Sequence, residues 1–192
     1  MNPTEGGFTP MGAVVHSSSL LHAGRVFRMV RERVTLDNGA ETQIDFIVHP
    51  GAAAVVPLDA EGRVLLLRQY RHAVGRAIWE IPAGTLGEGE EVLACAAREL
   101  AEETGFTAAV WRRLGEITPV PSYSDERIHL FLASDLRPAR QQLDFDEVLE
   151  VHRLPFAEAL AMVGRGEIED AKTICGLLLA ERHLGLAAGA FA

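Results

Sequence analysis

The sequence has few cysteines, no long apolar run and no secretion signal. Of its 192 residues only Cys95 and Cys175 are cysteines, and both lie in apolar, helix-like segments. Two cysteines are too few for a disulfide framework, so we interpret them as buried core residues. No apolar run reaches the roughly 20 residues that span a membrane, and the N-terminus lacks the basic and apolar regions of a signal peptide. We therefore expect a cytoplasmic protein without a membrane partner.

Positive charge is also scarce. The chain has 18 Lys and Arg against 27 Asp and Glu, a formal net charge of −9, and no basic cluster of the kind that binds nucleic acid. Hydrophobic residues make up 48% and charged residues 23%, which is ordinary for a globular domain with a sizeable core. An anionic ligand would need local compensation from metal ions or a few arginines.

The first fifty residues predict a β arm. The segment from Val14 to Val48 is β-like, and Asp37-Asn38-Gly39 is a turn signal between two strands. An isolated hairpin is only marginally stable, so this one must pack on the main body or on another subunit. Pro50-Gly51 marks the boundary. We divide the chain into an N-terminal tail and arm (1–50) and a main domain (51–192).

The main domain has the pattern of an α/β fold with a mixed sheet. Two continuous apolar runs, Ala52–Leu58 and Arg63–Arg68, indicate central strands that are covered on both faces. A helix is predicted from about Glu90 to Thr104, with Leu93, Ala96, Ala97 and Leu100 facing inward. Further strands are predicted at Ala108–Ile117, Arg127–Ala133 and Glu147–Leu154, and further helices at Pro155–Gly164 and, capped by Asp170, at Ala171–His183.

Three glutamates share one face of the first predicted helix. Glu99, Glu102 and Glu103 stand at i, i+3 and i+4, where like charges repel by a few tenths of a kcal/mol per pair. A solvated acidic face is one interpretation. The other is a site for a hard divalent ion such as Mg2+, which prefers oxygen ligands.

The spacing of this segment resembles the signature motif of the Nudix hydrolases. Gly84–Phe106 fills every fixed position of that motif: glycine, five residues, glutamate, seven residues, Arg-Glu, an aliphatic residue, any residue, Glu-Glu, any residue, glycine and an apolar residue. The resemblance implies an α/β/α sandwich whose loop-helix-loop holds Mg2+, or alternatively Mn2+, against a diphosphate.

The resemblance also implies roles within the motif. Glu99 and Glu103 are the expected metal ligands, with Glu103 counted as catalytic and Glu102 as a third ligand or a supporting carboxylate; the carbonyl of Ala83 is a further expected ligand. The expected structural residues are Gly84, Glu90, Arg98 and Gly105. Arg98 has two open interpretations, phosphate binding or orientation of the glutamates by a salt bridge, and we favour the second.

The catalytic base is expected outside the motif. The segment 144–151 resembles the loop and strand start where ADP-ribose pyrophosphatases keep a catalytic glutamate, and alignment of Leu149-Glu150-Val151 with their strand assigns the role to Glu147. Asp144, Asp146 and Glu150 are the neighbouring alternatives.

Substrate residues are expected in three further segments. Leu67–His72, which contains Arg68 and Arg71, resembles the stretch before the motif in ADP-ribose pyrophosphatases, where the later arginine reaches the substrate diphosphate. The resemblance assigns that role to Arg71, and a surface salt bridge is the alternative for it. Pro121, sixteen residues after Gly105, begins a loop that resembles the subfamily's substrate loop and contains Ser124 and Glu126. The segment 166–171 is similar to bacterial members.

Together these similarities imply Mg2+-dependent hydrolysis of ADP-ribose to AMP and ribose 5-phosphate. The alternatives are another nucleoside diphosphate sugar, such as GDP-mannose, or a non-catalytic ADP-ribose-binding regulator. The N-terminal tryptophans that stack adenine in some members are missing here, since the two tryptophans are Trp79 and Trp111. We expect a homodimer whose active site borrows from the arm.

Overall fold

The computed structural model describes residues 12–185 and forms two compact units. Of the described residues, 12–49 and 120–125 form one unit, and 50–119 and 126–185 form the other. Within residues 12–185 no helix has both the length and the apolar character that a membrane crossing requires.

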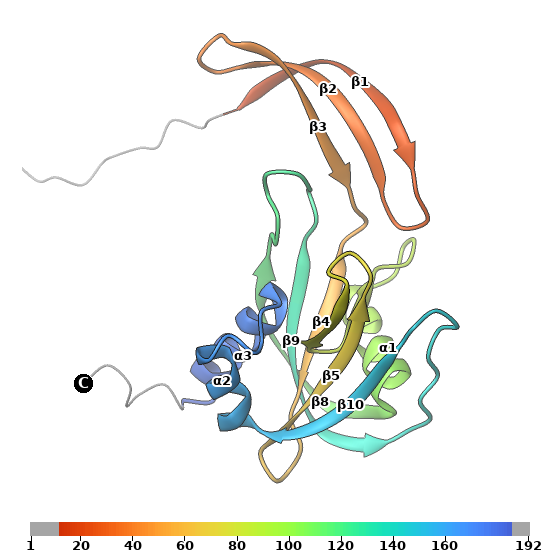
Figure 1. Cartoon of the computed structure of the whole chain (residues 1–192), viewed down its shortest axis with the longest axis vertical. Coiled ribbons are helices and arrows are strands. Elements are labelled where there is room, and N and C mark those ends of the chain that lie inside the picture. Colours follow the sequence, from red (N-terminus) through yellow and green to blue (C-terminus); the bar gives the residue numbers. More distant parts are fainter. Residues whose placement is uncertain (1–11, 186–192) are drawn as a thin grey trace, which may run out of the picture. The chain divides into compact units, whose positions relative to one another are not determined.

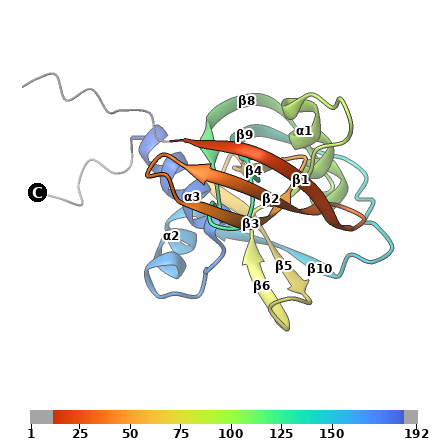
Figure 2. The ribbon, with the colours of Figure 1, turned by 90° about the horizontal axis from the view of Figure 1, so that it is seen from above.

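The first unit is an antiparallel sheet of three strands in the order β1-β2-β3 (Figures 1 and 2). The strands are β1 (Ala13–Ala23), β2 (Arg28–Leu36) and β3 (Glu41–Val48). Gly39, with φ 81°, closes the β2–β3 turn, and its N–H donates to the carbonyl of Leu36 at 2.8 Å. The predicted hairpin is therefore present, and β1 adds a third strand.

The second unit contains two sheets. A four-stranded mixed sheet has the order β7-β4-β9-β8, in which β4 and β9 are parallel, and a three-stranded antiparallel sheet has the order β10-β5-β6. The strands are β4 (Ala52–Pro57), β5 (Arg63–Arg71), β6 (Arg76–Glu80), β7 (Ala83–Thr85), β8 (Phe106–Ile117), β9 (Ile128–Pro138) and β10 (Leu149–Pro155).

Helices cover both faces of the mixed sheet, as the apolar run of β4 predicted (Figure 1). Successive side chains of a strand point to opposite faces. Ala53 and Val55 accordingly share one core cluster with residues of α1 (Val92–Thr104). Ala52, Ala54 and Val56 belong to the other cluster, with residues of α2 (Phe156–Gly164) and α3 (Ala171–His183). The α/β/α sandwich is confirmed.

The inward face of α1 differs from the predicted one. Leu93 is 45% exposed, whereas Cys95, Ala96 and Leu100 are fully buried. The helix is turned so that Glu99, at 8% exposure, also lies on the buried side. The apolar residues alone predict the wrong inward face for α1, because the buried face of this helix also includes carboxylates.

Helix α3 starts where the sequence predicts. The Asp170 side chain accepts a hydrogen bond from the backbone N–H of Thr173 at 3.0 Å, which is the N-cap arrangement. Leu177 and Ala180 are fully buried against the sheet. Gly176 packs so closely that an added Cβ would lie 2.9 Å from Cδ1 of Ile81. Helix α3 is therefore packed closely against Ile81, the residue that follows β6.

Candidate active site

The glutamates of α1 form a buried site rather than a solvated face. Glu103 is 1% exposed and Glu99 is 8% exposed, while the side chain of Glu102 is 40% exposed. Burying a carboxylate away from water is unfavourable unless hydrogen bonds or positive charge compensate it. The interpretation as a solvated acidic face is therefore excluded for two of the three residues.

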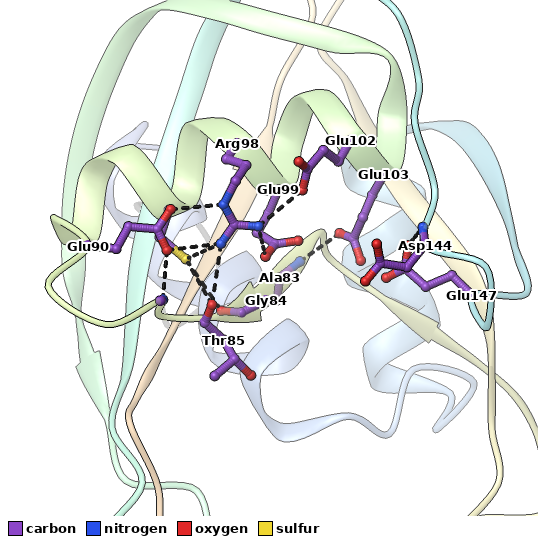
Figure 3. A network of polar contacts seen from close by, with 12 residues as sticks. Ala83, Gly84, Thr85, Glu90, Arg98, Glu99, Glu102, Glu103, Asp144 and Glu147 are labelled. Carbon is purple, nitrogen blue, oxygen red and sulfur yellow. Dashed lines mark hydrogen bonds and ion pairs between the residues drawn. The ribbon is translucent and has the colours of Figure 1, made fainter. Parts of the chain in front are cut away.

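Strand β7 lies directly against the two buried carboxylates (Figure 3). The backbone N–H of Ala83 donates to Oε2 of Glu103 at 2.9 Å. A Cβ added to Gly84 would lie 1.9 Å from Oε1 of Glu99, far inside van der Waals contact. Glycine is required at residue 84 because any side chain would displace the Glu99 carboxylate.

Arg98 joins the loop before α1 to the glutamates of the helix (Figure 3). Its Nε donates to Oε1 of Glu90 at 2.8 Å, and its Nη1 donates to Glu99 at 2.6 Å and to Glu102 at 3.0 Å. Nη2 reaches Glu90 and the carbonyl of Thr85. The salt bridges that the favoured interpretation requires are therefore present, while the role of Arg98 in orienting the glutamates stays a prediction.

Glu90 closes the loop before the helix. Its Oε2 accepts a hydrogen bond from the N–H of Gly87 at 2.8 Å, in addition to the contacts with Arg98. The hydrogen bonds from Arg98 and then from Gly87 lower the pKa of Glu90 to about 2. Glu90 is thus a fully ionised support of the loop.

The C-terminal end of α1 is tied to the segment that leads to the predicted base. Gly105, with φ 72°, ends the helix, and its N–H donates to the carbonyl of Ala101. Nε2 of Gln141 donates to the carbonyl of Glu103 at 2.6 Å, and the N–H of Gln142 donates to that of Glu102 at 2.9 Å. These bonds satisfy carbonyls that the helix leaves without intrahelical partners.

Glu147 extends from that segment toward Glu103 (Figure 3). Its carboxylate accepts a hydrogen bond from the N–H of Asp144 at 2.9 Å, and its own N–H donates to the carbonyl of Asp144. The negative charge of Glu147 contributes to the raised pKa values of both Glu99 and Glu103. Glu150, by contrast, has a side chain 77% exposed, beside His152.

The buried carboxylates have an excess of negative charge. Burial raises the pKa of Glu103 well above its ordinary value, and the charges of Glu99 and Glu147 add to that effect. Burial likewise raises the pKa of Glu99, although the charge and hydrogen bond of Arg98 oppose it. Such a set of oxygen donors suits a hard divalent cation.

The site is not a finished coordination shell. Within residues 12–185, no three acidic, histidine or cysteine side chains already stand as ligands around one point. Arg98 instead engages Glu99 and Glu102. The carboxylates fit a divalent ion by their chemistry and burial, although their present contacts are with Arg98 and the backbone.

Arg71, at the end of β5, pairs with a buried carboxylate. Its Nε and Nη2 each donate to an oxygen of Glu80 at 2.7 Å, and the side chain of Glu80 is 2% exposed. The hydrogen bond to Glu80 raises the pKa of Arg71, and the charges of Glu80 and Glu103 contribute further. Arg71 is therefore in a salt bridge, as the alternative interpretation holds, but its partner is buried and the charge of Glu103 also acts on it; its contact with a diphosphate stays a prediction.

The remaining predicted substrate residues lie in different places. The guanidinium of Arg68 stacks over the ring of Trp79, 5.2 Å from its centroid. Glu126 is half-buried in the second unit, just before β9. Ser124 belongs to the first unit, where it forms a parallel bridge with Ile47.

The sequence did not indicate Glu80 and Lys172 as site residues. Glu80 ends a short strand, and Lys172 follows a helix cap, so neither position has a local signal of function. Their burial, at 1% and 9% exposure, is the informative feature, because charged side chains are almost never buried unless they are paired.

Known proteins share both the motif and the fold. Residues 48–177 match the NUDIX domain. An ADP-ribose pyrophosphatase of Bacillus subtilis (strain 168) is 39% identical over 155 residues, which cover 80% of this chain and 84% of that protein. An ADP-ribose pyrophosphatase of Mycobacterium tuberculosis (strain ATCC 25618 / H37Rv) is 38% identical over 165 residues, 84% of this chain and 80% of that protein.

A crystal structure of an ADP compounds hydrolase has the same fold. It matches with a TM-score of 0.81 at 23% identity, and the match covers 92% of this chain and 96% of that chain. The chain therefore belongs to the Nudix family, and it is a Nudix hydrolase. Nudix pyrophosphatases generally use divalent metal ions, in agreement with the donor set around Glu103.

The contacts of Glu90 predict a pH-dependent stability difference. Glu90→Gln should lower the free energy of unfolding at pH 7 by about 1 kcal/mol, because the partly exposed ion pair with Arg98 becomes a neutral contact. The folded-state pKa of Glu90 is lowered from 4.5 to about 2, so its contribution is complete above pH 4.5 and is lost as the pH falls toward 2. Urea unfolding at pH 7 and pH 3 checks this. If Glu90→Gln lowers the free energy of unfolding by the same amount at pH 7 and pH 3, the prediction is contradicted.

Proposed function

We propose that this Nudix hydrolase cleaves the diphosphate of ADP-ribose to give AMP and ribose 5-phosphate, with Mg2+ as the cofactor. The observation that carries the proposal is the pair of buried carboxylates, Glu99 and Glu103, held against β7 and within electrostatic reach of Glu147 and Arg71. The choice of ADP-ribose is supported by the two relatives that are ADP-ribose pyrophosphatases.

Glu99, Glu103, Glu102 and the carbonyl of Ala83 would hold the ion. A bound Mg2+, or Mn2+ as the alternative, supplies charge neutralisation to the phosphate oxygens. Arg98 keeps Glu99 and Glu102 oriented through its hydrogen bonds. The burial of Glu103 supports its role as a ligand, because an adjacent cation relieves the cost of keeping its charge out of water.

Two residues outside the motif act on water and substrate. Glu147 accepts the proton of the attacking water, a role that requires a carboxylate close to the reacting phosphate. Arg71 binds the diphosphate through the donors that Glu80 leaves available, since a guanidinium has five N–H groups and two of them point at Glu80. Arg68 and Glu126 are further proposed substrate contacts within the second unit.

The proposed partner is a small nucleotide sugar rather than nucleic acid or a membrane surface. The net charge of −9 opposes binding to long polyanions. Cys95 and Cys175 are both free thiols, which supports the proposed location in the reducing cytoplasm.

The first unit supports a homodimer. Residues paired across its strands form an apolar face that includes Val15 opposite Val34, and Leu20 opposite Val30, while Arg31 and Asp45 form an ion pair on the other face. Leu20 is 59% exposed and Val15 is 53% exposed, although they lie on the apolar side. A sheet face of this kind is typical of an interaction surface, and we propose that a second copy of the chain covers it.

A substrate panel tests the activity. Purified protein with Mg2+ should release AMP from ADP-ribose faster than it releases GMP from GDP-mannose, with products separated by chromatography. Glu103→Gln should lower kcat at least about 100-fold, because it removes a charged ligand, while thermal unfolding shows that the fold persists. If ADP-ribose is hydrolysed no faster than GDP-mannose, the substrate assignment is wrong. Binding of ADP-ribose without hydrolysis would instead indicate a regulator.

Matched glutamine variants test the base. Glu147→Gln should lower kcat by about 10²–10⁴-fold with little change in KM, because the general base is lost. Glu150→Gln, which changes an exposed neighbour beside His152, should leave kcat within about twofold of the unmodified enzyme. A larger loss in Glu150→Gln than in Glu147→Gln would transfer the role to Glu150.

Two adjacent residues of β1 test the dimer. Leu20→Glu places a charge on the apolar face and should shift the protein from dimer to monomer at micromolar concentration, as measured by light scattering. Ser19→Glu places the same charge on the opposite, polar face and should leave the dimer intact. A monomeric unmodified protein would contradict the proposal.

A further inference from the structure

A single buried carboxylate connects the proposed diphosphate-binding arginine to the last helix. Glu80, at the end of β6, is 1% exposed and accepts hydrogen bonds from two cations. Both of its oxygens accept from Arg71 at 2.7 Å, and Oε2 also accepts from Nζ of Lys172. The three side chains come from β5, β6 and α3, so this network depends on the packing of distant segments.

Lys172 is held in place by the cap of α3. Oδ2 of Asp170 accepts from Nζ of Lys172 at 3.0 Å, and it also accepts from the N–H and the hydroxyl of Thr173. The hydroxyl oxygen of Thr173 accepts from the N–H of Ile81 at 2.9 Å. The first turn of α3 is thus bonded to the residue that follows Glu80, and the side chain of Lys172 is only 11% exposed.

The segment before α3 helps to fix the position of Lys172. Gly166 has φ 74°, a backbone conformation that favours glycine, and Ile168 is 1% exposed in the core. Asp170 then caps the helix. The segment 166–171 thus leads directly into the first turn of α3, where Lys172 lies.

The second cation changes the charge of the network around Arg71. Arg71 and Lys172 balance Glu80 and Asp170, so the network is neutral, whereas without Lys172 it would carry a net charge of −1. Nε and Nη2 of Arg71 are directed at Glu80, which leaves Nη1 available on a side chain that is 41% exposed. A guanidinium that is fixed in this way suits a diphosphate, provided that no excess negative charge lies beside it.

We propose that Lys172, acting through Glu80, is a positioning residue that orients Arg71 toward the substrate diphosphate and balances the negative charge beside it. This inference rests on the proposed function, in which Arg71 binds the diphosphate. Lys172 itself does not touch substrate in this arrangement, because its ammonium group is directed at Glu80 and Asp170.

Substitution of Lys172 tests the inference. Lys172→Met should raise KM for ADP-ribose about tenfold and change kcat less than about threefold, since a lost ground-state contact to the diphosphate weakens binding more than chemistry. Lys172→Arg keeps the charge and should restore most of the affinity. An unchanged KM in Lys172→Met would overturn the inference.

Arg76 provides a matched control. Arg76 of β6 pairs with Glu169, just before α3, at 2.5 Å, and both side chains are exposed. Arg76→Met therefore removes the same charge and a bridge between the same two segments, but it leaves Glu80 untouched. Its KM should stay within about twofold. A tenfold rise in this variant would show that overall charge, and not the position of Lys172, determines affinity.

A double-mutant cycle separates positioning from stability. In an Arg71→Ala background, Lys172→Met should change KM less than about twofold, because the residue through which it acts is gone. An undiminished tenfold effect there would overturn the inference. If ADP-ribose proves not to be a substrate, the proposed function fails, and the same cycle on the best diphosphate of the panel still decides the role of Lys172.

A charge-balanced double variant tests the inference if Lys172→Met does not fold. Should Lys172→Met not fold, Glu80→Gln/Lys172→Met removes both charges and leaves no unpaired carboxylate in the core. Arg71 then loses its anchoring carboxylate, and KM should again rise about tenfold. A KM equal to that of the unmodified enzyme would overturn the inference.

Discussion

The active site depends on the burial of two carboxylates against the backbone of one short strand. Glu99 touches Gly84 so closely that no side chain fits there, and Glu103 is bonded to the N–H of Ala83. That approach requires α1 and β7 to flank the same central strand, β4, which contacts both. The fully apolar β4 is therefore a condition for the site as well as for the core.

Arg98 compensates only part of the negative charge of the glutamates in the motif. Arg98 is partly exposed and forms ion pairs with Glu90, Glu99 and Glu102, so it offsets part of their negative charge. Glu103 is deeper, and burial and its neighbours' charges raise its pKa, so it is the carboxylate that a divalent ion relieves most. The motif thus combines Arg98, which pairs with several glutamates, with a buried carboxylate whose charge a divalent cation would balance.

Local signals predicted local structure well and long-range contacts poorly. Gly105 as the helix end, Asp170 as a cap and the covered strand β4 follow from short patterns, and all are present. The sequence predicted that Leu93 faces inward, but it is exposed because α1 turns its carboxylates inward. That orientation depends on contact with β7 and not on the apolar residues of the helix. Glu80 and Lys172 are 92 residues apart, and no pattern in either segment indicates that they meet.

The proposed metal ligands and the proposed diphosphate-binding arginine are positioned by different parts of the chain. This difference explains how one motif can serve different substrates. The proposed metal-binding carboxylates lie within a single loop and helix, so their geometry depends mainly on that segment and on the strand β4 that both of its parts contact. Arg71, the proposed ligand of the diphosphate, lies outside the motif, and its position depends on how β5, β6 and α3 pack. Substitutions in α3 that keep the core intact can alter the field around Arg71 without touching the metal ligands. Substrate affinity can therefore change in this fold while the chemistry of bond cleavage is retained.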